Sequence, residues 1–375
     1  MTRSGGDEPA LGRPRTASME PDTPARLIDW KAIVGIAISV LLLAYVFRNV
    51  DPREVVHEIG RADPLLLIAA TAAATAVFWA RAWRWRSILT PVSPDTPFRS
   101  RFAAVNIGFM ANNLLPARVG EFARAYALAR LTPVPVVAGL SSLVVERLLD
   151  ALFLVLALFA TMALPDFPPW PSNAGVDFPA LARGFGLGAI AIAAVLFLLV
   201  LRPRFAVRLL EAVARRVLPA TFRRPVIDAL EAFLAGAGVL RQPVLMARAI
   251  AWTVVVWLLN GLGFWLAFHA FDLDLSLTAA FFFQSCLAFA VSIPAAPGFF
   301  GTYEAAASIV LVELWGREAT KALGFAIGFH IAGFIPVTLM GLYYAGKLGL
   351  SLRGVAQSGE IVEEAVEKET GHSSG

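Results

Sequence analysis

Long runs of apolar residues alternate with shorter polar segments over most of the chain. A helix of ~20 apolar residues crosses the ~30 Å hydrocarbon core of a bilayer, and several of the runs approach this length. The pattern therefore predicts an all-α, polytopic membrane protein with about eight transmembrane helices. Their expected positions are residues 31–47, 65–86, 136–164, 183–201, 247–271, 277–294, 299–315 and 322–346.

Two apolar regions, 102–131 and 294–304, are interrupted by residues that end or bend helices. Irregular backbone is tolerated at membrane depth only where protein or water covers it. We therefore expect re-entrant or broken helices in both regions, although the sequence leaves open whether 102–116 spans the membrane or re-enters it. The expected hinge residues are Pro116, Gly120, Pro294, Pro297, Gly298 and Gly301. Paired interruptions in the two halves of a transporter point to a site at the bilayer midplane.

The composition supports a membrane protein. Of the 375 residues, 58% are hydrophobic and 16% are charged, whereas soluble domains carry about 25% charged residues. The chain divides into a polar tail at 1–28, expected to be disordered and cytoplasmic, a transmembrane domain at 29–350 and a polar cytoplasmic tail at 351–375.

Arginines are unevenly distributed among the predicted loops. They are frequent in 81–101 and 202–248 but absent from 165–182 and 272–274. Because cytoplasmic loops carry the excess of Lys and Arg, the first two loops are predicted inside and the other two outside. A multi-pass protein with both termini in the cytoplasm satisfies this assignment, except that the external loop 48–64 also contains arginines.

Charged residues within the apolar region are the strongest functional signal. Each charge costs roughly 2.5–3.5 kcal/mol at the bilayer centre, so these groups must pair, lie near the interface or line a wet cavity. They are Arg118, Glu121, Arg124, Glu146, Arg147, Asp150 and Glu304. Glu121 and Arg124 are spaced to pair on one helix. Glu146 and Asp150 share a helix face and need a cation between them, so we expect an arginine of the 118–124 motif to contact them.

Other signals are weaker. Trp79, Trp83 and Trp85 alternate with arginines, a pattern that favours an interfacial belt for anchoring over substrate contact. Cys286 is the only cysteine, and the four histidines lack the spacing of metal ligands. We find no phosphate-binding loop, dinucleotide fingerprint or nucleophile elbow, and therefore expect neither metal, cofactor nor enzymatic activity. No basic domain with exposed aromatics indicates nucleic-acid binding.

Three motifs resemble the lysylphosphatidylglycerol synthase transmembrane region family, which includes the flippase part of multiple peptide resistance factors. They are the stretch from Asn113 to Arg124, the Glu146–Asp150 motif and the stretch from Pro294 to Glu304. The resemblance implies a bacterial-type inner-membrane protein that moves an amphiphilic phospholipid between leaflets. Bifunctional relatives carry a large C-terminal aminoacyl-transfer domain. This chain ends soon after the last predicted span, so we do not expect it to synthesise the aminoacylated lipid.

These observations lead to one main hypothesis and two alternatives. In the main hypothesis Arg118 and Arg124 hold the lipid phosphate, and the four carboxylates balance these arginines or meet a cationic headgroup. Arg147 is also expected at the headgroup site. A separate aminoacyltransferase or glycosyltransferase is a possible partner, and the oligomeric state stays open. The first alternative is a subunit or enzyme of polyprenyl-linked glycolipid or envelope polysaccharide assembly. The second is a scaffold for another membrane protein.

Overall fold

The computed structural model describes residues 30–48, 50–165, 167–169, 238–292, 296–362 and 364, with 187, 205, 208 and 212 as isolated positions. All regular secondary structure within these residues is helical, so the all-α prediction is confirmed. The predicted span at 183–201, apart from Leu187, and the tail at 1–28 lie outside the described residues, as does Pro294.

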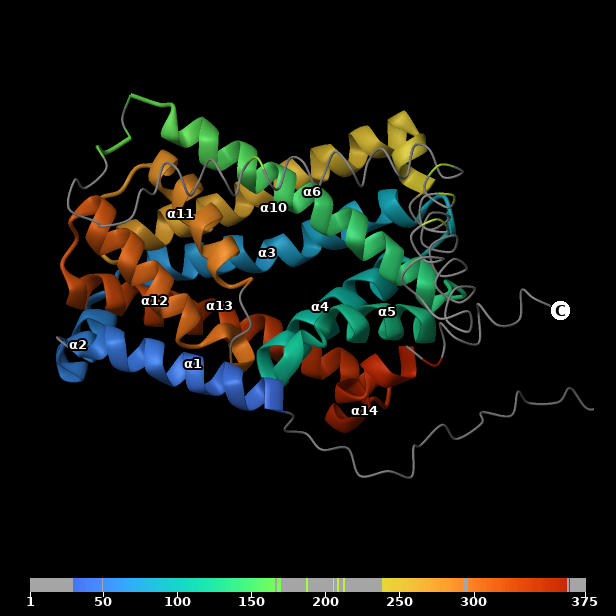
Figure 1. Cartoon of the computed structure of the whole chain (residues 1–375), viewed down its shortest axis with the longest axis horizontal. Coiled ribbons are helices and arrows are strands. Elements are labelled where there is room, and N and C mark those ends of the chain that lie inside the picture. The colour runs from blue at the N-terminus through green and yellow to red at the C-terminus, as the bar shows by residue number, and fades with distance from the viewer. Residues whose placement is uncertain are drawn as a thin grey trace, which may run out of the picture.

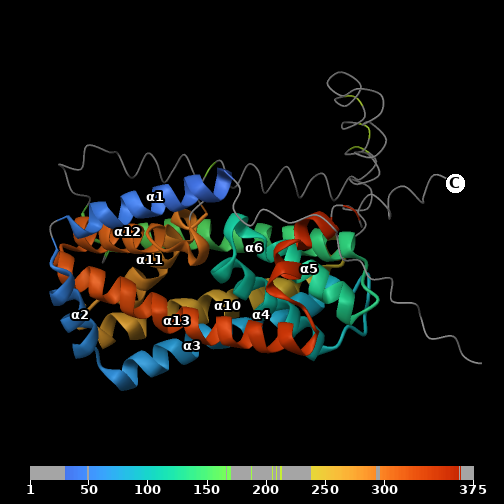
Figure 2. The same ribbon diagram turned by 90° about the horizontal axis from the view of Figure 1, so that it is seen from below.

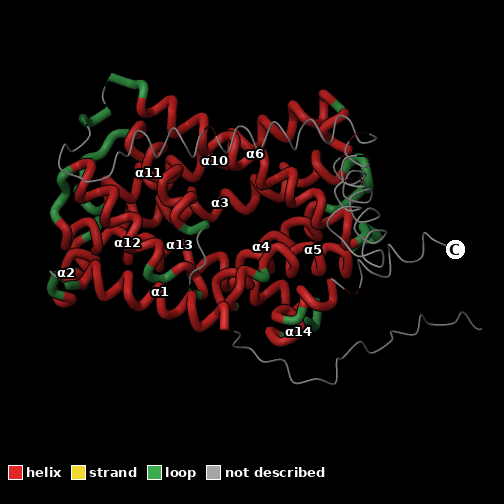
Figure 3. The backbone as a smooth tube through the Cα atoms, viewed as in Figure 1, coloured by secondary structure: helices red, strands yellow, loops and turns green. Residues whose placement is uncertain are grey.

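The helices lie along the long axis of an elongated bundle (Figures 1, 2 and 3). The first half contains α1 (Trp30–Phe47), α2 (Pro52–Arg61), α3 (Pro64–Leu89), α4 (Phe98–Leu114), the short turn η1 (Pro116–Arg118), α5 (Gly120–Leu131) and α6 (Val136–Met162). The second half contains η2 (Gly238–Arg241), α10 (Pro243–Ala270), α11 (Leu277–Ala290), η3 (Pro297–Phe299), α12 (Thr302–Ile309), the π-helical turn η4 (Val310–Leu314), α13 (Ala319–Lys347) and α14 (Leu352–Ala356).

Three of these helices are long and apolar enough to cross a membrane: α3, α10 and α13. The α1–α2 pair, bent by 84°, adds a fourth candidate as one broken span. The chain is therefore a multi-pass membrane protein. The predicted spans at 277–294 and 299–315 contain the short helices α11 and α12, which are not long enough to cross the membrane separately. The total number of spans stays a prediction.

The two interrupted regions form helical hairpins. In the first, α4 and α5 have 17 and 12 residues, and η1 joins them. In the second, α11 and α12 have 14 and 8 residues, and η3 lies between them. At 1.5 Å per residue an arm of 14 residues is about 21 Å long, too short for the hydrocarbon core. The regions predicted as spans at 277–294 and 299–315 are the two arms of this second hairpin.

The halves repeat the same order of elements in opposite orientations. Each hairpin is flanked by two long helices, α3 and α6 in one half and α10 and α13 in the other. In Figure 1, α3 and α13 run from left to right, whereas α6 and α10 run from right to left. The helices α3 and α10 pack against each other, α4 packs against α13, and α11 packs against α6. Each hairpin therefore lies against a long helix of the other half, and the tips η1 and η3 meet inside the bundle.

Local sequence explains where several helices begin. Asp63 accepts hydrogen bonds from the backbone N–H groups of Leu65 and Leu66 at 2.8 and 3.0 Å, and Pro64 follows it at the start of α3. Ser276 caps α11 in the same way. An acceptor side chain at this position satisfies N–H groups that the first turn leaves unpaired, and proline there loses no hydrogen bond.

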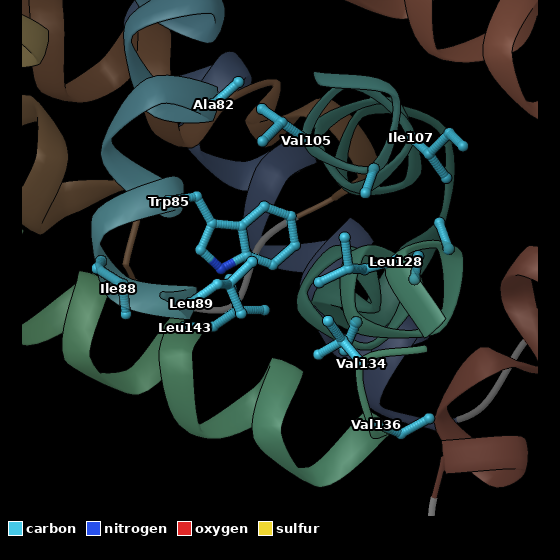
Figure 4. Packing of buried hydrophobic residues seen from close by; sticks show 14 of the residues in the cluster. Ala82, Trp85, Ile88, Leu89, Val105, Ile107, Leu128, Val134, Val136 and Leu143 are labelled. Atoms are coloured by element: carbon cyan, nitrogen blue, oxygen red, sulfur yellow. The ribbon is translucent and has the colours of Figure 1, made fainter. Parts of the chain in front are cut away.

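The bundle has two main buried cores, one formed mostly by each half. The first surrounds Trp85, whose Nε1 donates to Ser142 Oγ at 2.7 Å, and contains residues of α3, α4, α5 and α6 (Figure 4). The second is rich in aromatic residues from α10, α11 and α13. These are Phe264, Phe268, Phe271, Phe283, Phe325 and Phe329. The rigid cores hold the long helices on which the hairpins rest.

Candidate functional site

A buried cluster of charges lies where α3, α5 and α6 meet. The helix α6 presents Glu146 and Asp150, four residues apart, to the interior, and both are buried. Arg124 of α5 reaches Glu146 with both terminal nitrogens, at 2.7 and 2.9 Å. The same guanidinium lies 4.0 Å from the centre of the Trp85 ring. The expected contact between the 118–124 motif and α6 is therefore present, and Arg124 is the residue that makes it.

Two arginines of α3 complete the cluster. Arg84, which is fully buried, places Nη2 3.2 Å from Asp150 Oδ2 and 3.0 Å from Glu146 Oε1, so it bridges the two carboxylates. Arg81 lies 3.3 Å from Asp150 and 3.5 Å from Glu146. Trp257 of α10 adds a hydrogen bond from Nε1 to Asp150 Oδ1 at 2.9 Å.

The interpretation of the tryptophan–arginine stretch as a membrane anchor is therefore wrong for Arg81 and Arg84. These residues lie three apart, so they share one helix face, and that face points to α6 rather than to the lipid. The three-residue spacing in the sequence indicates that the two arginines share a helix face. That this face contacts α6 is seen only in the tertiary structure.

Arg147 differs from the other arginines of the cluster. Its Nη2 lies 2.9 Å from Glu146 Oε1 and 3.5 Å from Asp150 Oδ2, yet 45% of its side chain is exposed. It faces a cavity of about 350 Å³ that Arg118, Glu121, Arg124 and Asp150 also line. We call this space the arginine cavity.

Arg118 lies at the tip of the first hairpin, with a φ of 55° in the left-handed region. Its guanidinium donates to the carbonyl oxygens of Val291 and Ser292, at 2.7 and 2.9 Å, where α11 ends. It also lies 5.3 Å from the ring centre of Phe299 in η3. Arg118 therefore connects the two hairpin tips while it lines the arginine cavity.

The expected pairing of Glu121 with Arg124 is not formed, because the Arg124 guanidinium points to Glu146. Glu121 lies in the first turn of α5 and faces the arginine cavity. The turn before it is tight: Gly120 donates its N–H to Asn112 Oδ1 at 2.9 Å, and its Cα faces the carbonyl of Gly108 too closely for a Cβ. Gly120 is therefore required for α4 and α5 to approach each other.

Glu304 belongs to a separate pair in the second hairpin. It is 1% exposed, accepts the N–H of Gly301 at 2.6 Å and lies 2.6 Å from Nδ1 of His330 on α13. The His330 ring stacks on Tyr303 with 4.0 Å between ring centres. Glu304 is thus not part of the arginine cluster, and His330 is a paired polar residue.

The second hairpin turns at residues with positive φ. The values are 68° for Gly298, 62° for Phe299 and 88° for Gly301. Helix α1 covers this turn: Ser39 Oγ accepts the N–H of Ala296 at 3.0 Å, and the Ser39 carbonyl occupies the place that a Cβ on Gly301 would need. Gly298 and Gly301 therefore adopt backbone conformations that favour glycine, and Pro297 starts η3. Their role as hinges stays a prediction.

A second cavity, of about 290 Å³, lies on the other side of the tips. Its wall is mainly aromatic and includes the amides of Asn113, Asn260 and Gln284, for which we call it the amide cavity. Five residues line both cavities: Phe109, Trp257, Ala288, Val291 and Phe299. The two spaces are therefore neighbours, separated by side chains from both halves. Within the described residues, no group of three His, Cys, Asp or Glu side chains is arranged to hold a metal ion.

One protein-family model matches most of the chain. The model of the lysylphosphatidylglycerol synthase TM region matches residues 32–341, which contain both hairpins and the whole charge cluster. The chain belongs to this family. The lysylphosphatidylglycerol synthase TM region thus includes every element described above except the start of α1 and the residues after Gly341.

Three curated proteins are similar to the chain. Glycosyltransferase AglD of Haloferax volcanii is 26% identical over 353 residues, which cover 88% of this chain but only 56% of the relative. A UPF0104 membrane protein of Methanothermobacter thermautotrophicus is 24% identical over 336 residues, or 86% of this chain and 97% of the relative. A UPF0104 membrane protein of Methanocaldococcus jannaschii is 29% identical over 132 residues, or 34% of this chain and 39% of the relative.

Proposed function

We propose that the protein binds the phosphate of an amphiphilic membrane phospholipid in the arginine cavity and translocates the lipid between leaflets. The observation that carries this proposal is the half-exposed guanidinium of Arg147 above a buried cluster with excess positive charge. Phosphate is the anion that the arginine fork suits best, because two parallel N–H groups meet two oxygens.

The charge balance supports an anionic ligand. The buried charge cluster and the lining of the arginine cavity together hold five arginines and three carboxylates, which leaves two positive charges in excess. The arginines are Arg81, Arg84, Arg118, Arg124 and Arg147, and the carboxylates are Glu121, Glu146 and Asp150. Uncompensated charge at membrane depth costs roughly 2.5–3.5 kcal/mol per group. A bound phosphate would offset this cost, whereas a cationic headgroup would meet repulsion.

The buried donors point in the same direction. The Nε–H groups of Arg81, Arg84 and Arg124 have no hydrogen-bond partner among the described residues. Buried donors are rarely left unpaired in native proteins. An anion or its hydration water in the adjoining cavity would supply acceptors to this network.

The arrangement of the hairpins supports transport. In transporters with inverted repeats, substrate sites lie where broken helices of the two halves meet, and one half rocks against the other. Here the two tips meet between the two cavities, and Arg118 joins them. We found no nucleotide-binding motif in the sequence, so we propose passive or gradient-driven exchange. The arginine-rich 81–101 end and both termini would face the cytoplasm.

Reconstitution tests the proposal. Purified protein in vesicles should accelerate leaflet exchange of a labelled anionic phospholipid, and Arg147→Ala should slow that exchange by about ten-fold, since it removes a charged hydrogen bond to the phosphate. Arg130→Ala, an arginine of α5 that lies outside both cavities, is the matched control. Exchange equal to that of empty vesicles for anionic, zwitterionic and aminoacylated lipids would contradict translocation.

A second candidate function comes from one relative. The name of the Haloferax volcanii protein is glycosyltransferase, so the chain is alternatively a subunit or enzyme of polyprenyl-linked glycolipid or envelope polysaccharide assembly. A separate glycosyltransferase or aminoacyltransferase would then be its partner. Accumulation of a sugar-lipid intermediate in a deletion strain, together with no exchange in vesicles, would favour this function over translocation.

A further inference from the structure

We infer that the amide cavity receives an uncharged, hydroxyl-bearing group of the ligand, so that the preferred lipid carries a sugar or polyol beyond its phosphate. This inference rests on the proposed function, because it takes phosphate binding in the arginine cavity as its starting point. It adds the substrate class, which neither the family nor the relatives define for this chain.

The main observation concerns Gln284 of α11. Its side chain lines the amide cavity and is 1% exposed, and both Oε1 and Nε2 lack hydrogen-bond partners among the described residues. A buried amide is expensive to leave unpaired. In a wall rich in apolar side chains, an unpaired donor and acceptor next to each other mark a place where a ligand can form both bonds.

The rest of the wall fits hydroxyl groups better than an acyl chain. Asn113 and Asn260 add two further amides, which can donate and accept as hydroxyls do. Asn113 Nδ2 already donates to Thr338 Oγ1 at 2.8 Å, so its Oδ1 is the atom that it offers to a ligand. Phe264 and Phe329 supply apolar ring faces against which the C–H groups of a sugar or polyol can pack. If the cavity held only an acyl chain, its three amides would face a ligand that cannot form hydrogen bonds with them.

The charged residues around the amide cavity favour a neutral group over a cationic one. No carboxylate lines the amide cavity, and the charged residue in its wall is Arg81. Glu304 is close behind His330 but is 1% exposed and already bonded to Gly301 and His330. An ammonium group in this cavity would therefore have no free counter-charge, whereas a neutral hydroxyl group avoids that cost.

The two cavities are close enough for one ligand. Phe109, Trp257 and Phe299 line both. A phosphate held in the arginine cavity therefore lies on one side of these shared side chains, and the group that it carries would enter the amide cavity where they move apart. Phosphate binding in the arginine cavity would select an anionic lipid, and Gln284 would select the headgroup attached to that phosphate.

Lipid binding tests this inference. Purified protein in phosphatidylcholine nanodiscs is titrated with phosphatidic acid, phosphatidylglycerol and phosphatidylinositol of equal acyl chains. The wild type should bind the two polyol lipids about ten-fold more tightly than phosphatidic acid, the value of one or two additional hydrogen bonds. Gln284→Leu should bring this ratio close to one, while Gln357→Leu, the same change at a buried glutamine outside both cavities, should keep it.

The outcomes separate the two proposals. Equal binding of all three lipids by the wild type, with Arg147→Ala weakening each of them, would overturn the polyol site and leave phosphate binding intact. Tighter binding of every lipid by Gln284→Leu would show that an acyl chain fills the cavity and would also overturn it. Binding that does not depend on Arg147 would contradict the proposed function itself. If Gln284→Leu fails to elute as a folded protein, Asn260→Leu replaces it with the same expectation.

Discussion

In the first half of the molecule Arg124 of α5 pairs with Glu146 of α6, and at the corresponding place in the second half Glu304 of α12 pairs with His330 of α13. The two pairs occupy equivalent positions, since each joins the second arm of its hairpin to the long helix that follows that hairpin. The chemistry differs, because Glu146 contacts four arginines whereas Glu304 has one side-chain partner and one backbone partner.

This difference shows that two halves with the same order of helices can carry different side-chain chemistry. The first half concentrates charge beside the arginine cavity, and the second half keeps its polar groups local and surrounds the amide cavity with aromatic rings. The shared geometry brings the two tips together, while the unlike side chains give the two cavities different chemistry, as the proposal of one ligand in both requires.

The sharpest test of the comparison is to neutralise both acids. Glu146→Gln should lower the free energy of unfolding by about 3–5 kcal/mol, because it leaves buried arginines without their counter-charge. Glu304→Gln, which removes one charge from a local pair, should cost only about 1–2 kcal/mol. Unfolding in mixed micelles measures both, and equal losses would show that the two pairs have equivalent roles.

The hairpin turns provide a second comparison. Gly301→Ala should destabilise by about 2–4 kcal/mol, because a Cβ would meet the Ser39 backbone and the residue has positive φ. Gly333→Ala on α13 is the control, since a Cβ there meets nothing within 4 Å. Thermal unfolding of the two variants in one detergent checks the expectation, which fails if Gly301→Ala is as stable as Gly333→Ala.

Removing the connection between the tips should have a smaller effect. Arg118→Ala loses two hydrogen bonds from a charged donor to backbone carbonyls, worth about 1–3 kcal/mol locally. We expect faster amide hydrogen exchange around Val291 and Phe299, and little change around Trp85 in the first core. Unchanged exchange at Val291 and Phe299 in a folded variant would show that packing alone holds the tips together.

The smallest expected effect lies within the first core. Ser142→Ala removes the acceptor of the Trp85 indole and should cost about 1 kcal/mol. Lipid exchange should stay close to that of the wild type, because Ser142 lines neither cavity. A loss of exchange as large as that of Arg147→Ala would mean that core packing, rather than the charged site, controls transport.

Much of this arrangement could be predicted from the sequence. Proline and glycine act through local backbone geometry, so the breaks near Pro116 and Pro297 were visible, as was the shared order of proline, glycine and glutamate in the two hairpins. The cost of unpaired charge in a membrane also predicted that an arginine of the 118–124 motif would contact Glu146.

The remaining features depend on which helices pack together. Arg81 and Arg84 follow the same pattern as arginines at a membrane surface, and only the packing of α3 against α6 turns them inward. Arg118 lines the arginine cavity, but its guanidinium also reaches carbonyls more than 170 residues away along the chain, which the sequence did not indicate. Glu304 was grouped with the other acids, although its partner His330 lies on a different helix.

The contact of α1 with the second hairpin has a consequence for how the protein is made. Ser39 and Ala296, which form one hydrogen bond, are separated by 257 residues. A ribosome makes α1 first, and chains fold from the N-terminus as they emerge. The face of α1 around Ser39 therefore cannot form this contact until the second hairpin has been synthesised and inserted. Helix α1 therefore enters the bilayer well before α12, the helix that it packs against.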